Sequence, residues 1–267
     1  ITHSPFSSRQ ILVAAILLGT TLTSAPLAAQ QLLWSDEFDE GVAPNPEVWS
    51  YDLGANGWGN QELQEYTDDL ENARVENGNL VITARETVPG TSAAAFSSAR
   101  LRTQDKVMFK YGTIEARIKV PNIARGLWPA FWTLGNNFSE VGWPNCGELD
   151  ILEMGWRDAV SDGNANRWVS SAAHWEDANR YAFFGRTYDP SLIESFDFYE
   201  DYHTFKMNWT PNTITTYLDD REIWTMDISP GSCNDCEEFH QPHFMILNLA
   251  VGGTFTGLMT PGEITAP

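Results

Sequence analysis

Three acidic residues, Glu148, Asp150 and Glu153, stand within six positions of one apolar segment. Carboxyl groups crowded onto one surface repel one another, and this repulsion raises the pKa of at least one of them. A carboxyl group that keeps its proton near neutral pH can protonate a leaving group as a general acid. The pattern therefore indicates acid–base chemistry, and its plain alternative is a solvated acidic face of a strand.

The spacing of the three acids restricts the secondary structure that could bring them together. In a helix, Glu148 and Glu153 would lie about 140° apart around the axis, and Asp150 would occupy another face. In a regular strand, Glu148 and Asp150 share a face, whereas Glu153 points to the opposite side. One extra residue between Asp150 and Glu153 returns Glu153 to the shared face, and such β-bulges are frequent beside active sites. The sequence therefore predicts a bulged strand in a concave sheet.

Aromatic residues on both sides of this segment favour a binding site over a solvated face. Trp128 and Trp132 alternate along one run and are candidate platforms for a flat ligand, with burial in the core as the alternative for Trp132. Trp143 lies just before the acids and is expected to form a wall of a cleft. His174 follows the acids and is expected either in the cleft or as a hydrogen-bonded strand residue.

Alternation with a period of two dominates the elements that must position these residues. In residues 114–120, apolar side chains fall on even positions and charged side chains on odd positions, which is typical of a half-buried strand. Strands are expected at residues 79–84, 114–120, 203–209, 213–218, 221–226 and 244–251. Asp219-Asp220 is a two-residue hairpin signal, and no four-turn amphipathic helix is expected. These strands predict an all-β fold, a sandwich or jelly roll of two packed antiparallel sheets with a concave cleft.

Composition narrows the class of ligand. The 267 residues include 36 acidic and 16 basic side chains, which gives a formal charge of −20. Nucleic acid and anionic membrane surfaces both require a basic face, so neither is an expected partner. Eleven tryptophans suggest an uncharged ligand that stacks on indole rings, although most of these rings are expected in the core.

The first 29 residues have the order of a secretory signal peptide. A positive residue, Arg9, precedes an apolar run at residues 11–18, and small residues follow up to Ala29. The run is too short to span a bilayer, and no second run of sufficient length occurs in the sequence. We expect cleavage near Ala29 and Gln30, export of the chain, and one domain over residues 30–267.

Three cysteines are too few for a disulfide scaffold. Cys233 and Cys236 could close a small disulfide loop in an oxidising compartment. A single CxxC motif is weak evidence for zinc, because a structural zinc site has four ligands. Cys146 is expected to be a small buried apolar residue.

The segment Gly147-Glu-Leu-Asp-Ile-Leu-Glu153 resembles the active-site strand of glycoside hydrolase family 16. It is similar to the bulged E-x-D-x-x-E form found in laminarinases, agarases and carrageenases, whereas lichenases carry E-x-D-x-E. The resemblance extends over nearly the whole chain after the leader, through the segments 34–39, 59–66, 98–103, 126–132 and 248–253. It implies a β-jelly roll whose concave face binds a polysaccharide.

The resemblance also implies roles for individual residues. Glu148 resembles the nucleophile and Glu153 the acid/base of a retaining glycosidase, with Asp150 as an assisting acid between them. Two such carboxyl groups about 5–5.5 Å apart would form a covalent glycosyl-enzyme intermediate. The residues expected to line the cleft by this resemblance are Asn60, Arg100, Trp128, Trp132 and Trp175.

A neutral β-1,3-glucan of the laminarin type is the expected substrate. The acidic chain disfavours sulfated galactans, and mixed-linkage glucan, agarose or glucan binding without hydrolysis stay open as alternatives. The chain is expected to act as a secreted monomer, without a cofactor for catalysis. By resemblance, Glu37 and the carbonyl group of Gly78 match two ligands of a structural calcium ion. The sequence ends at Pro267, before the expected closing strand that would supply a third ligand.

Overall fold

The computed structural model describes residues 31–87, 94–188, 197–233 and 236–265. The predicted leader, residues 1–29, lies outside the described residues. The chain divides into two units between Asp36 and Glu37. All of the structure discussed below belongs to the second unit.

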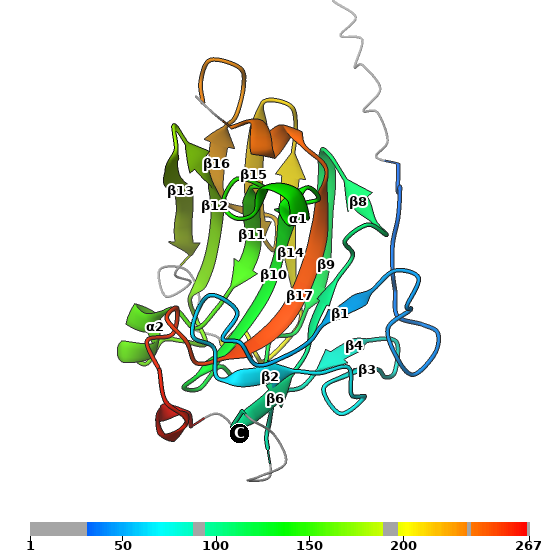
Figure 1. Cartoon of the computed structure of the whole chain (residues 1–267), viewed down its shortest axis with the longest axis vertical. Coiled ribbons are helices and arrows are strands. Elements are labelled where there is room, and N and C mark those ends of the chain that lie inside the picture. The colour runs from blue at the N-terminus through cyan, green and yellow to red at the C-terminus, as the bar shows by residue number, and fades with distance from the viewer. Residues whose placement is uncertain (1–30, 88–93, 189–196, 234–235, 266–267) are drawn as a thin grey trace, which may run out of the picture. The chain divides into compact units, whose positions relative to one another are not determined.

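The larger sheet carries the acidic segment. Its main path, with all neighbouring strands antiparallel, is β1 (Ser50–Asp52), β7 (Arg100–Arg102), β17 (His243–Val251), β10 (Leu127–Gly135), β11 (Glu148–Glu153), β12 (Val169–Asp177) and β13 (Arg180–Tyr188). β8 (Met108–Phe109) also pairs with β17. Figure 1 shows β17, β10 and β11 side by side as long, curved strands. The acidic strand therefore lies in the middle of a curved antiparallel sheet.

The second sheet contains four antiparallel strands. Their order is β16 (Arg221–Asp227), β15 (Thr213–Leu218), β14 (His203–Trp209) and β9 (Gly112–Ile118). Asp219 and Asp220 join β15 to β16 with φ angles of 47° and 63°. Positive φ at both central residues is the geometry of a type I′ turn, which confirms the predicted hairpin.

Two smaller sheets and several short helices complete the described fold. The smaller sheets are β2 (Gln64–Tyr66), β6 (Phe96–Ser98) and β5 (Arg85–Glu86), and the pair β3 (Ala73–Val75) and β4 (Leu80–Ile82). The helices are α1 (Phe138–Val141), α2 (Arg157–Ser161), η2 (Glu237–His240) and η3 (Pro261–Glu263). The pair β2 and β6 is parallel, whereas the two large sheets are antiparallel, as predicted. No helix in the described ranges is long and apolar enough to cross a membrane.

The main core lies between the two large sheets. Phe131 and Leu149 from the larger sheet pack in one buried cluster with Met207, Trp209 and Trp224 from the smaller sheet. The indole nitrogen of Trp224 donates to the backbone oxygen of Ser171 at 3.0 Å, so a polar contact also joins the sheets. The concave face of the larger sheet, opposite this core, is left available for a ligand.

The cysteines follow the sequence-based expectations. Cys233 and Cys236 form a disulfide with their Cα atoms 5.8 Å apart. Cys146 is a free thiol, fully buried in the core. This disulfide closes a short loop just before η2.

Candidate active site

A β-bulge in β11 brings the three acids onto one face. On the neighbouring strand β12, Asp150 lies opposite Ala172 and Glu153 lies opposite Ser170, so three steps along β11 match two steps along β12. The extra residue lets Ile151 and Leu152 both bury their side chains in the core between the sheets. Glu153 therefore returns to the concave face beside Glu148 and Asp150, as the sequence predicted.

The three acids have different polar neighbours. The indole nitrogen of Trp128 donates to Oε1 of Glu153 at 3.0 Å. Nε2 of His174 lies 3.0 Å from Oδ2 of Asp150 and 3.9 Å from Oε1 of Glu148. The three acids therefore occupy different electrostatic environments.

Burial raises the pKa of all three carboxyl groups. The pKa of Glu148 rises to about 8, first through burial and then through the charge of Asp150, while His174, Arg100 and a hydrogen bond from Trp143 oppose the rise. Burial also raises the pKa of Asp150. The pKa of Glu153 lies well above its ordinary value because of burial and the neighbouring Asp150 charge. Since these groups interact, they exchange protons as one unit.

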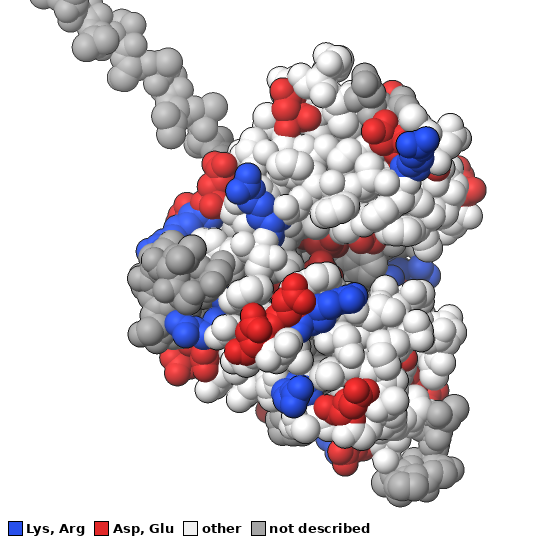
Figure 2. Space-filling view, turned by 90° about the vertical axis from the view of Figure 1, so that its left-hand side faces the viewer, with Lys and Arg blue, Asp and Glu red and all other residues white. Residues whose placement is uncertain are grey.

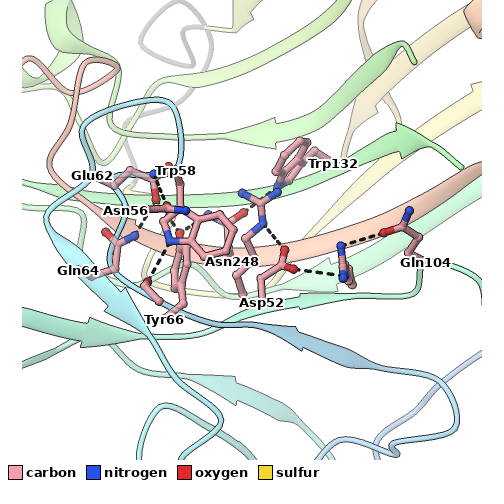
Figure 3. A network of polar contacts seen from close by, with 12 residues as sticks. Asp52, Asn56, Trp58, Glu62, Gln64, Tyr66, Gln104, Trp132 and Asn248 are labelled. Atoms are coloured by element: carbon pink, nitrogen blue, oxygen red, sulfur yellow. Dashed lines mark hydrogen bonds and ion pairs between the residues drawn. The ribbon is translucent and has the colours of Figure 1, made fainter. Parts of the chain in front are cut away.

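Arg100 lies against two indole rings on the β10 side of the acids. Its guanidinium carbon is 5.1 Å from the ring centroid of Trp58 and 4.7 Å from that of Trp132. Its Nε is 2.9 Å from Oδ2 of Asp52, and Asp52 also pairs with Arg102 at 3.2 Å. Figure 3 shows Asp52, Trp58 and Trp132 gathered in this network. The ion pairs hold the guanidinium group against both rings.

A second chain of hydrogen bonds fixes the edge of Trp132. Its indole nitrogen donates to Oδ1 of Asn248 at 2.7 Å, and Nδ2 of Asn248 donates to the hydroxyl oxygen of Tyr66 at 3.2 Å. That hydroxyl donates to Glu62 at 3.0 Å, as drawn in Figure 3. An indole N–H can only donate and a carboxylate can only accept, so the two ends fix the direction of every bond. Trp132 is therefore held on its edge as well as on its face.

Asn60 joins this network through its neighbour. Its side chain hydrogen-bonds Glu62, whose pKa is raised by burial. Its backbone oxygen accepts from the amide of Thr254 at 2.7 Å. Asn60 is thus placed beside the Trp132 network.

His174 fulfils both expectations from the sequence, since it faces the cleft and is also a hydrogen-bonded strand residue. Its Nε2 faces the acids, and its Nδ1 lies 2.7 Å from the hydroxyl oxygen of Tyr181. Trp143 packs on Tyr181 with ring centroids 5.3 Å apart and remains half exposed. Both His174 and Trp143 therefore lie with the acids.

Trp175 does not line the cleft, which corrects the expectation from resemblance. Neighbouring residues of a strand point to opposite faces, so Trp175 must lie on the far side from His174. It is only 8% exposed and packs in the core against Phe239, with ring centroids 5.6 Å apart. Its role is to fill the space between the sheets.

Trp128 lies on the concave face, but its geometry does not suit a stacking platform. Its ring is buried and lies nearly parallel to Phe255, with centroids 4.5 Å apart and an interplanar angle of 10°. Phe255 thereby covers one of its faces. The contact that remains for chemistry is its hydrogen bond to Glu153.

A carboxylate lies close to Gly78, one of the two predicted calcium ligands. Asp39 Oδ1 lies 3.4 Å from the position that a Cβ atom on Gly78 would take, so a carboxylate does approach this turn. Calcium prefers six to eight oxygen ligands. Among the described residues, however, Glu37 belongs to no cluster of three metal-binding side chains; Glu148, Asp150 and His174 form the one such cluster. Calcium binding at Glu37 and Gly78 stays a prediction.

Several residues of the site were missed in the sequence. Trp58, Tyr66 and Asn248 support Trp132, and Tyr181 contacts His174. No acidic residue lies on the face of β17 that carries Asn248. Its contact with Trp132 can therefore be recognised only from the pairing of β17 with β10. Figure 2 shows the surface hollowed by a groove with acidic side chains inside it.

Comparisons with known proteins agree with this geometry. Residues 60–257 match the family described as glycosyl hydrolases family 16. A beta-glucanase from Rhodothermus marinus is 34% identical over 93% of this chain and 86% of its own length. The laminarinase catalytic domain from Thermotoga maritima MSB8 has a TM-score of 0.72 and 38% identity, over 88% of this chain and 92% of that one.

A Bacteroides ovatus mixed linkage glucan protein of the same family was solved with the product G4G4G3G. It has a TM-score of 0.75 and 32% identity, over 88% of this chain and 92% of that one. The two packed sheets and the bulged acidic strand are consistent with these matches, which cover most of the sequence. The chain therefore belongs to glycosyl hydrolase family 16, a family of β-jelly-roll glycoside hydrolases.

Proposed function

We propose that this chain is a secreted endo-β-1,3-glucanase that cleaves its substrate with retention of configuration. The observation that carries the proposal is the bulge in β11, which places Glu148 and Glu153 on one face in different environments. A pair of carboxyl groups with separate roles is what a retaining glycosidase requires.

In the first step, a carboxylate oxygen of Glu148 attacks the anomeric carbon of the glucosyl unit. Glu153 gives its proton to the glycosidic oxygen as that bond breaks, so the leaving chain departs as a neutral alcohol. Burial and the charge of Asp150 raise the pKa of both glutamates, that of Glu153 well above its ordinary value and that of Glu148 to about 8. Glu153 therefore keeps the proton that it donates. Glu148 must ionise before it attacks, which His174, Arg100 and the hydrogen bond from Trp143 favour.

In the second step, the ionised Glu153 takes a proton from water. The hydroxide equivalent bonds to the anomeric carbon, and the ester bond to Glu148 breaks to restore its carboxylate. Two inversions at one carbon give net retention. Water is the only co-reactant, so the proposed catalysis needs no cofactor.

Asp150 and His174 are proposed to position the nucleophile. Asp150 lies between the two glutamates in the strand, and its contact with Nε2 of His174 is 3.0 Å. Through this pair, a proton on Asp150 can be shared with Glu148 while Glu148 loses and regains its charge. Loss of Asp150 should therefore cost less activity than loss of either glutamate.

Several observations favour a neutral β-1,3-glucan as the substrate. The net charge of −20 disfavours anionic polysaccharides. The Thermotoga maritima relative is named a laminarinase, and the Bacteroides ovatus relative carries a mixed linkage glucan product. Mixed-linkage glucan is therefore the second candidate substrate.

Export and a structural calcium ion belong to the same proposal. The predicted leader at residues 1–29 supports secretion, and the disulfide between Cys233 and Cys236 suits an oxidising compartment. Glu37 and Gly78 would hold calcium through oxygen atoms, away from the reacting carboxyl groups. The ion would serve stability only.

The test is hydrolysis of laminarin, mixed-linkage glucan and agarose by the wild type and by Glu148→Gln and Glu153→Gln, measured as new reducing ends. We expect the wild type to be most active on laminarin and each variant to lose at least about a thousandfold in kcat. Tight laminarin binding without release of reducing ends by the wild type would contradict the proposal and indicate a glucan-binding protein.

A further inference from the structure

Three aromatic rings gather around His174 at the β13 side of the concave face, and we call Trp143, Tyr181 and Phe183 the aromatic platform. Tyr181 and Phe183 lie nearly parallel, with an interplanar angle of 14° and centroids 6.2 Å apart. The ring of His174 is within 23° of both of them. The four rings therefore form one continuous aromatic surface.

The aromatic platform is exposed to solvent, unlike most large apolar side chains of this chain. Trp143 is 49% exposed, Tyr181 52% and Phe183 65%. Contiguous exposed apolar area is unfavourable in water and commonly marks a binding site. A surface of this kind next to the acids therefore indicates a ligand-binding site.

The platform is continuous with the reacting groups. Phe183 lies opposite His174 across β12 and β13, and His174 lies opposite Glu148 across β11 and β12. The charges of Glu148, Asp150 and Glu153 raise the pKa of Tyr181, after the larger effect of burial. A ligand bound at the acids would therefore extend over these rings.

The register also shows that the platform lies across β11 from Trp132 and the residues that hold its ring. Trp132 pairs with Asp150 from β10, on one side of β11, whereas His174 and Phe183 follow on the other side. A polysaccharide crossing the strands would contact Trp132 and Arg100 on one side of the acids and the platform on the other.

We propose that Trp143, Tyr181 and Phe183 form a glucosyl-binding subsite on the β13 side of the scissile bond. This inference rests on the proposed function and adds a second binding region to it. The axial C–H bonds of a β-glucosyl ring form flat apolar faces, which suit the electron-rich faces of aromatic rings. The acids nearby favour an uncharged occupant over an anionic one.

Binding on both sides of the acids has a kinetic consequence. A glucan must extend past the reacting bond in both directions to use all contacts, so the gain from the platform grows with chain length. The enzyme should therefore cleave inside long chains and discriminate against short ones.

The test compares Phe183→Ala with Phe183→Tyr, which keeps an aromatic ring, across laminarin oligosaccharides of increasing length. Leu70→Ala is the matched control, since Leu70 is an exposed apolar residue in the turn between β2 and β3. We expect Phe183→Ala to lower kcat/KM on the longest oligosaccharide by about fivefold, with a smaller loss on the shortest. Phe183→Tyr should restore most of the loss, and all variants should unfold at wild-type temperatures.

A binding measurement separates this inference from the proposed function. In the Glu148→Gln background, Phe183→Ala should weaken laminarin binding by about fivefold in calorimetry. If the wild type hydrolyses laminarin but Phe183→Ala matches Leu70→Ala at every length and in binding, the subsite is wrong while the proposed function stands. Self-association of the wild type that Phe183→Ala abolishes would also overturn the subsite, because the platform would then be a protein interface.

Discussion

At the scale of single residues, the division of labour between Glu148 and Glu153 can be tested by chemical rescue. Glu148→Gly leaves space for azide to attack the anomeric carbon directly, so we expect an α-glucosyl azide from an activated aryl glucoside. Glu153→Ala keeps the nucleophile, so azide should attack the covalent intermediate and give the β-glucosyl azide. Product configuration by proton NMR checks both. Exchange of the two outcomes would reverse the assignment.

Glu148 also couples stability to pH. Its pKa in the folded chain is about 8, above the ordinary 4.5, so between these values the folded state holds a proton that the unfolded state has lost. Raising the pH from 5 to 9 therefore disfavours folding through this group. Glutamine cannot titrate, so Glu148→Gln should gain about 1–3 kcal/mol over the wild type in this pH window. Urea unfolding at both pH values measures the gain, and an equal difference at pH 5 and pH 9 would contradict it.

At the scale of elements, the start of β11 depends on a close approach to η2. Gly147 has a φ of 75°, and a Cβ atom there would lie 2.7 Å from Cβ of Glu238. Gly147→Ala therefore combines backbone strain with a clash, and the shift is transmitted to the adjacent Glu148. We expect a loss of about 2–4 kcal/mol in unfolding free energy and a lower kcat.

Gly163→Ala is the control for that substitution. Gly163 has a similar φ of 73°, but no atom lies within 4 Å of the position of its added Cβ. It should lose only about 1–2 kcal/mol, from backbone strain alone. Thermal and urea unfolding of the two variants decide the matter, and equal losses would show that the contact with Glu238 does not position β11.

The elements and the acids were the most predictable parts of the sequence. The runs at residues 203–209 and 213–218 gave both strands their correct bounds, and in the first of them the buried side chains alternate with less buried ones. The position of Glu153 followed from counting residues against a period of two. The position of Trp175 was predicted wrongly, because the prediction followed the family resemblance and not the alternation of side chains along the strand.

Contacts between distant segments could not be predicted from local patterns. Trp58 meets Arg100 and Tyr66 meets Asn248 only because separate strands pair in a particular register. The parallel pair of β2 and β6 depends on the same long-range arrangement. Tyr181 and Phe183 alternate as any strand residues do, and only their exposure on the concave face distinguishes them.

At the scale of the whole molecule, the charge of −20 should weaken the binding of anionic substrates relative to neutral ones. A carboxymethylated β-1,3-glucan is repelled by this charge, and added salt screens the repulsion. Its KM should therefore fall several-fold between 0.02 and 0.5 M salt, whereas the KM for laminarin should stay nearly constant. Steady-state kinetics across this range give the comparison. A parallel change for both substrates would mean that salt acts on the enzyme itself rather than on the repulsion between the enzyme and the anionic substrate.

The account depends most on two carboxyl groups of one bulged strand acting on the same glycosidic bond by double displacement. The most direct measurement is a proton NMR time course of laminarin hydrolysis by the wild type, which reads the configuration of each new reducing end before mutarotation. We expect the β-anomer to appear first, with the α-anomer following later at the mutarotation rate. First appearance of the α-anomer would show single displacement by water and contradict the role given to Glu148.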